Sequence, residues 1–152
     1  MPGFKRIQRG LRAIFGLARP DDDWVQGWLL EEEYALFEKL DPRDREHSVL
    51  VAKELLRRYP EAPAAVVRAA LLHDVGKTVR PYRAMERILT ALFEPYLPAL
   101  PPEPPLPGWR GAVQVRLHHE RYGRSMITDP EVKRALAEPP WKDRIQAIDD
   151  EY

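Results

Sequence analysis

The sequence predicts an all-α fold, and three observations carry that prediction. Apolar residues recur at helical spacing along much of the chain. Helix-start signals recur too, because Asp41-Pro42 and Asp129-Pro130 each place an N-cap aspartate before a proline suited to the first helical position. No segment shows the alternation of a β-strand backed by a hairpin turn. We therefore expect a bundle of helices.

Length and composition indicate one globular domain over residues 1–152, with helices in 1–40 packed on a core formed by 41–152. Lys+Arg and Asp+Glu balance at 24 each, so the chain as a whole has no strong attraction for nucleic acid. No apolar run reaches the length of a membrane span, the N-terminus does not resemble a signal peptide, and cysteine is absent. We expect a cytoplasmic protein with no membrane span and no specific nucleic-acid partner, and the sequence leaves its oligomeric state open.

The first expected helix covers residues 4–15 and is basic and amphipathic. Two interpretations are open: a helix on a membrane surface, or a first helix whose bases face the acidic stretches at 21–23 and 31–33. Pro20 and the aspartates after it break this helix. Residues 24–40 then carry a large apolar face and predict one or two further helices.

The next two helices carry the most informative polar residues. A helix from Asp41 to about Tyr59 has the apolar stripe Leu50, Val51, Leu55 and Tyr59, and His47 falls on the same stripe. A helix over 63–75 is apolar on nearly all sides, which predicts a central position in the core. His73 and Asp74 fall in its last turn, and Gly76 is a natural stop.

The second half of the chain is predicted in less detail. A helix is expected over 82–93, followed at 95–107 by a proline-rich connection that is either a lid or a surface linker. Residues 109–117 fit a helix and a strand about equally well. In the last helix one face is formed by Trp141, Ile145, Ile148 and Tyr152. Asp149 borders that face, whereas Asp150 points to water.

His73 and Asp74 close an apolar helix, where a buried imidazole beside a carboxylate is costly unless something compensates the pair. A metal ion would do so. The alternative is that Asp74 only pairs with Lys77 or an arginine. His47 and Asp149 are predicted at buried faces of two other helices and are candidates to join the pair.

The pattern H…HD…D, with HD at the end of an apolar helix and Gly-Lys after it, resembles the HD-domain superfamily of metal-dependent phosphohydrolases. The resemblance covers roughly residues 45–150 and is most specific at residues 73–77 (HDVGK). Residues 145–150 resemble the closing segment, although Ile148 stands where an alanine is usual. The N-terminal helices and the proline-rich insert resemble those of small bacterial HD proteins. The implied fold is a compact HD-domain-like bundle.

This resemblance implies a divalent metal held by His47, His73, Asp74 and Asp149. Two imidazoles and two carboxylates suit Mn, Fe, Co, Ni, Zn or Mg. Asp74 would also help to activate water. Lys77 would contact substrate phosphate or orient Asp74.

The segment His118-His119-Glu120 is the second feature that the resemblance addresses. His119 would bind a second metal ion or polarise the leaving phosphate, or the two histidines are only a surface pair. The Gly-Tyr-Pro segment of the subgroup that cleaves cyclic dinucleotides is missing, and so is the acidic pair of the (p)ppGpp-hydrolysing subgroup.

The implied activity is hydrolysis of a nucleotide or another small phosphate ester, with metal-activated water as the nucleophile. The alternative is a degenerate HD module that binds a nucleotide or a partner protein without turnover. Four arginines are candidates for an anion site, and the sequence does not rank them: Arg43, Arg45, Arg80 and Arg124.

Overall fold

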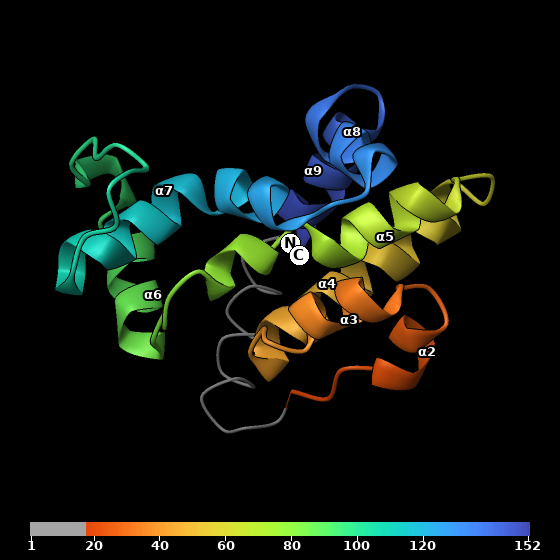
Figure 1. The fold of residues 1–152 in the computed structure, drawn as a ribbon, viewed down its shortest axis with the longest axis horizontal. Coiled ribbons are helices and arrows are strands. Elements are labelled where there is room, and N and C mark those ends of the chain that lie inside the picture. Colours follow the sequence, from red (N-terminus) through yellow and green to blue (C-terminus); the bar gives the residue numbers. More distant parts are fainter. Residues whose placement is uncertain (1–17) are drawn as a thin grey trace.

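The computed structural model describes residues 18–152, and in this part of the chain all regular structure is helical, as predicted (Figure 1). The expected helix over residues 4–15 lies outside the described residues. The α-helices are α2 (Asp22–Gln26), α3 (Glu31–Phe37), α4 (Pro42–Arg58), α5 (Ala64–Leu72), α6 (Ala84–Leu92), α7 (Gly108–Met126), α8 (Pro130–Ala137) and α9 (Trp141–Glu151). Two short 3-10 helices, η1 (Val75–Thr78) and η2 (Glu94–Tyr96), complete the described structure.

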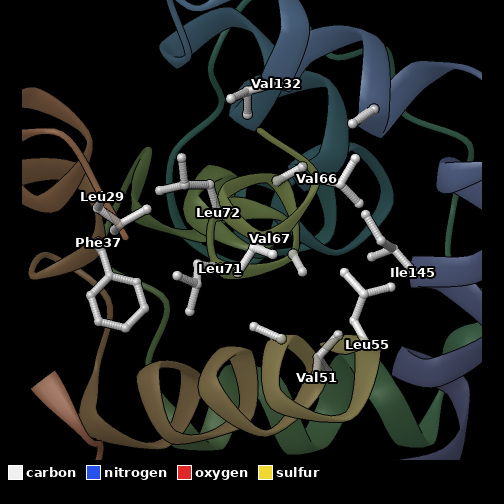
Figure 2. Packing of buried hydrophobic residues seen from close by; sticks show 14 of the residues in the cluster. Leu29, Phe37, Val51, Leu55, Val66, Val67, Leu71, Leu72, Val132 and Ile145 are labelled. Carbon is white, nitrogen blue, oxygen red and sulfur yellow. The ribbon is translucent and has the colours of Figure 1, made fainter. Parts of the chain in front are cut away.

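Helix α5 lies at the centre of the core, as its apolar sequence predicts. Every residue from Ala65 to Leu72 is buried except Arg68. Figure 2 shows side chains of α4, α8, α9 and the α2–α3 region around it, among them Leu55 and Ile145. Burying one side chain of this size stabilises the fold by about 1.5–3 kcal/mol, so α5 and its neighbours form a firm frame for the residues that follow it.

Helix α4 begins as predicted, because the Asp41 carboxylate accepts the Asp44 N–H at 3.0 Å. His47, Val51 and Leu55 are buried on the face toward α5. The prediction was wrong for Leu50, which is 39% exposed. Neighbours on a helix point about 100° apart, and the buried face is centred on the Val51 side of the helix, so Leu50 turns outward.

Helix α5 ends earlier than predicted, and the reason for a glycine at position 76 is a close backbone contact rather than the end of this helix. The helix stops at Leu72, His73 caps it, and Asp74 lies in the turn before η1. A Cβ atom added to Gly76 would lie 1.7 Å from the His119 carbonyl oxygen. The backbones of η1 and α7 therefore touch, and only glycine permits that approach.

Helix α7 settles the ambiguous segment as a helix, and the proline-rich connection packs along it. The Gln114 amide donates to the carbonyls of Pro101 and Pro104, and the Tyr122 hydroxyl donates to the carbonyl of Pro102. Figure 1 shows this connection and α6 together at one end of the molecule, away from α5. None of the helices in residues 18–152 has the length and apolar character to cross a membrane.

Candidate metal centre

Three of the predicted ligands converge from three elements. His47 of α4, His73 at the end of α5 and Asp149 of α9 each offer a ligand atom, and these atoms lie within 4.8 Å of one another. Asp149 Oδ1 is 2.5 Å from His47 Nε2 and 3.4 Å from His73 Nε2. Residues 102 positions apart in the sequence thus meet at one point because α4 and α9 pack against each other beside α5.

The orientation of His73 suits a metal ligand. Its Nδ1 lies 2.7 Å from the Ala70 carbonyl oxygen, which can only accept, so Nδ1 carries the proton. Nε2 is left to face the two carboxylates, and it is buried without a hydrogen-bond partner. A histidine ring with one nitrogen donating to a carbonyl and the other facing carboxylates has the orientation usual for a metal-binding histidine.

Asp74, the fourth predicted ligand, stands beside this group rather than within it. Its Oδ2 is 3.6 Å from His73 Nε2 and 2.7 Å from Lys77 Nζ. The lysine also lies 4.0 Å from Asp44, which Arg87 holds at 2.7 Å. The sequence alternative that Asp74 pairs with Lys77 is therefore part of the structure. The remaining carboxylate oxygen, Oδ1, faces His119 instead.

The electrostatics of the centre favour charged partners. Burial alone would raise the pKa of Asp74, but Lys77 and His73 outweigh it and hold that pKa far below the usual range. The pKa of Asp149 is likewise lowered, against the effect of burial, by His47 and His73. Burial lowers the pKa of His73, yet the carboxylates of Asp74 and Asp149 raise it to about 9. The two carboxylates thus remain anionic and attract any cation placed between them.

The adjacent histidines of α7 have different surroundings. His119 Nδ1 lies 3.2 Å from the Val115 carbonyl oxygen, and its Nε2 lies 3.6 Å from Asp74 Oδ1. His118 points elsewhere, with Nε2 donating to the Leu100 carbonyl at 2.6 Å in the proline-rich connection. The contact of Gly76 with the backbone of His119 is what brings α7 this close to Asp74.

A cleft that opens to solvent lies against this candidate metal centre. Ten residues line it: His73, His119, Glu120, Gly123, Arg124, Leu136, Lys142, Ile145, Gln146 and Asp149. The Gln146 amide donates to Asp149 Oδ2 at 3.4 Å and to Asp150 Oδ1 at 3.0 Å, so it helps to orient Asp149.

The sequence reasoning missed two polar residues of this cleft, Lys142 and Gln146. Lys142, Gln146 and Asp149 are spaced at i, i+4 and i+7 on α9, which places them on one helical stripe. That spacing was the available signal, because any side chain on the stripe of a metal ligand will border the same cleft.

The residues present fit a divalent cation. The centre offers imidazole nitrogen and carboxylate oxygen atoms, one buried ring nitrogen lacks a partner, and a second carboxylate stands within 3.6 Å of that nitrogen. Nitrogen and oxygen donors of this kind suit the divalent first-row metals, and magnesium where carboxylates predominate.

Comparison with known protein families identifies the family of this chain. The family model described as HD domain matches residues 45–149, which is more than half of the sequence. The protein belongs to the HD domain family, in agreement with the H…HD…D pattern. This family is part of a superfamily of metal-dependent phosphohydrolases, and its members bind divalent metals. No curated protein and no solved structure matches the chain.

Proposed function

We propose that the protein hydrolyses a nucleotide or another small phosphate ester at a divalent metal centre. The observation that supports this most is the meeting of His47, His73 and Asp149 at the wall of an open cleft, with Asp74 beside them. We assign these four residues as the metal ligands. A divalent ion supplies two things in such a site: it lowers the pKa of water and it offsets negative charge on a phosphate oxygen.

The remaining side chains of the centre have separate roles in this proposal. Asp74 keeps its charge because Lys77 holds one oxygen, so the other oxygen is available to orient water. Lys77 is engaged with Asp74 and also lies near Asp44, so we assign it to positioning Asp74 rather than to contact with substrate.

His119 lines the cleft and faces Asp74, and burial lowers the pKa of its imidazole. It is placed to contact a phosphate oxygen or the leaving group, whereas His118 is bound to the proline-rich connection. We therefore assign only His119 to the chemistry.

The test is a turnover assay with a panel of nucleoside monophosphates, cyclic nucleotides and p-nitrophenyl phosphate, each with Mn²⁺, Co²⁺, Ni²⁺, Zn²⁺ and Mg²⁺. We expect one or more esters to be hydrolysed, and Asp74→Asn to lower the rate at least about a hundredfold because it loses both ligand charge and proton acceptor. Asp143→Asn, an exposed aspartate on α9 outside the cleft, is the matched control and should keep full activity.

Two outcomes would contradict the proposal. Equal rates in Asp74→Asn and in the unchanged protein would show that hydrolysis arises elsewhere. Absence of turnover with every ester and metal, in a protein that does bind metal, would favour the alternative of an HD module that binds a nucleotide or partner protein without turnover.

A further inference from the structure

Two cationic side chains line the cleft beside the metal centre, one from each wall. Arg124 belongs to α7, five residues after His119, and Lys142 belongs to α9, seven residues before Asp149. At 1.5 Å per residue these separations amount to roughly 7.5 and 10.5 Å along the helix axes, distances that long arginine and lysine side chains can partly cover. The two cations therefore line the same cleft as His73 and Asp149 of the candidate metal centre.

Arg124 differs in its partners from several other half-buried arginines. Three of them are each held by two carboxylates: Arg58 by Glu54 and Glu151, Arg68 by Glu33 and Asp129, and Arg87 by Asp41 and Asp44. Arg124 is also half-buried, yet within residues 18–152 no carboxylate or other hydrogen-bond acceptor is bound to its guanidinium. A guanidinium that lines a cleft and binds no acceptor of the described chain is available to an external anion.

Lys142 has no ion-pair partner among the described residues either. Glu120 is one of the two acidic residues in the cleft lining, and it is exposed. It lies one helical turn before Arg124, but the described structure shows no ion pair between the two side chains. Asp149, the other carboxylate of the lining, is engaged with His47. The cleft thus keeps two cationic side chains that form no ion pair with a carboxylate of the described residues.

Two positive charges in the cleft indicate the charge of the phosphate group that the substrate carries. A phosphate monoester carries about −1.5 to −2 charges at neutral pH, whereas a diester carries one. We infer that Arg124 and Lys142 form an anion subsite for a dianionic phosphate group, so that the substrate is a phosphomonoester rather than a phosphodiester. This inference rests on the proposed function and specifies its substrate class. Leu136 and Ile145 supply an apolar wall for the remainder of the molecule.

Equilibrium dialysis with inorganic phosphate at pH 8 tests the subsite without requiring turnover, with bound metal measured in parallel. We expect Arg124→Gln to weaken phosphate binding roughly tenfold, the loss typical of one charge-assisted hydrogen bond, and Lys142→Gln to weaken it by a smaller factor because Lys142 is exposed. Dimethyl phosphate, a monoanion, should compete at least roughly tenfold more weakly than phosphate. The matched controls are Arg121→Gln and Lys133→Gln, which change exposed cations of α7 and α8 outside the cleft.

Unchanged phosphate affinity in both cleft variants, or dimethyl phosphate competing as well as phosphate, would overturn the inference. So would a parallel loss of bound metal in Arg124→Gln, because the arginine would then act through the metal centre. If the cleft variants lose phosphate binding but keep the metal, the subsite is supported, whether or not any ester is hydrolysed. A failure to hydrolyse every ester would contradict the proposed function and not the subsite.

Discussion

Helices α5 and α6 are both nine residues long and both rich in apolar side chains, yet the structure uses them in opposite ways. From Ala65 onward α5 is buried except at Arg68, and it ends at the metal centre. On α6 the large apolar residues are exposed, and Leu92 is 68% exposed. Apolar content alone therefore does not decide burial, which depends on the elements that surround a helix.

Helix α6 is connected to the metal centre by ion pairs rather than by apolar packing. Arg87 of α6 binds Asp44 at 2.7 Å and Asp41 at 3.0 Å, both at the start of α4, and its guanidinium lies over the ring of Tyr82. Asp44 in turn lies 4.0 Å from Lys77. The comparison therefore predicts that α5 contributes to stability through its buried leucines, whereas α6 contributes through the ion pairs of Arg87.

The largest effect is expected from matched leucine substitutions. Leu71→Ala in α5 should lower the free energy of unfolding by about 2–5 kcal/mol, because Leu71 is fully buried and alanine leaves a cavity. Leu92→Ala in α6 should change it by no more than about 0.5 kcal/mol. Urea denaturation of both variants measures the difference, and equal losses would show that α6 is covered in solution.

The backbone contact between η1 and α7 provides the second test. Gly76→Ala should cost about 3 kcal/mol, because the added Cβ meets the His119 carbonyl, which belongs to a helix and cannot turn away. Gly27→Ala is the control, since its Cβ would meet the Trp24 carbonyl oxygen at 3.3 Å, a tight contact that a small shift of this exposed turn relieves. A stable Gly76→Ala protein with unchanged metal affinity would mean that this contact does not position α7.

The contribution of α6 through charge is tested by Arg87→Gln. We expect the free energy of unfolding to fall by about 2 kcal/mol, because the nearly buried Asp44 carboxylate loses its strongest partner while Lys77 remains within 4.0 Å. Arg83→Gln, at an exposed position of the same helix start, should be neutral. Equal stability in the two variants would show that Arg87 does not link α6 to the residues beside the metal centre.

The smallest effect concerns surface charge on α4, the helix that packs against α5. Hydrogen bonds from Arg57 and Arg58 lower the pKa of Glu54 to about 2. A depressed folded-state pKa stabilises the protein above the ordinary value of 4.5, and this contribution is lost as pH falls from about 5 toward 2.

Because the cluster is near the surface, we expect a contribution of at most about 1 kcal/mol. It is measured as the stability difference between the unchanged protein and Glu54→Gln at pH 7 and at pH 3. A difference that does not shrink on acidification would contradict the assignment to Glu54.

Much of the fold could be predicted from the sequence because its signals are local. The Asp-Pro pairs at 41–42 and 129–130 do begin α4 and α8, with each aspartate capping its helix. Asp149 is half-buried and Asp150 exposed, as the spacing on the last helix predicts. The family was also identified correctly, since the H…HD…D pattern is carried by few residues with a distinctive chemistry.

What the sequence could not supply depends on contacts between distant elements. Gly76 was interpreted as a helix stop, whereas the structure places it against the backbone of α7, a contact that no local pattern encodes. The two histidines 118 and 119 look equivalent in sequence, but the proline-rich connection binds one and the metal centre faces the other. The spacing of Lys142 from Asp149 on α9 was a local signal, but only the packed structure shows that α7 supplies the other residues of the cleft that Lys142 lines.

The central claim is that His47, His73, Asp74 and Asp149 hold a divalent metal ion. Elemental analysis of the purified protein after exposure to Mn²⁺ or Ni²⁺ tests it most directly, with His73→Ala compared to His118→Ala, the nearby histidine bound to Leu100. We predict near-stoichiometric metal in the unchanged protein and in His118→Ala, and loss of the metal in His73→Ala. Equal metal in all three proteins, or none in any of them, would contradict the assignment of this centre.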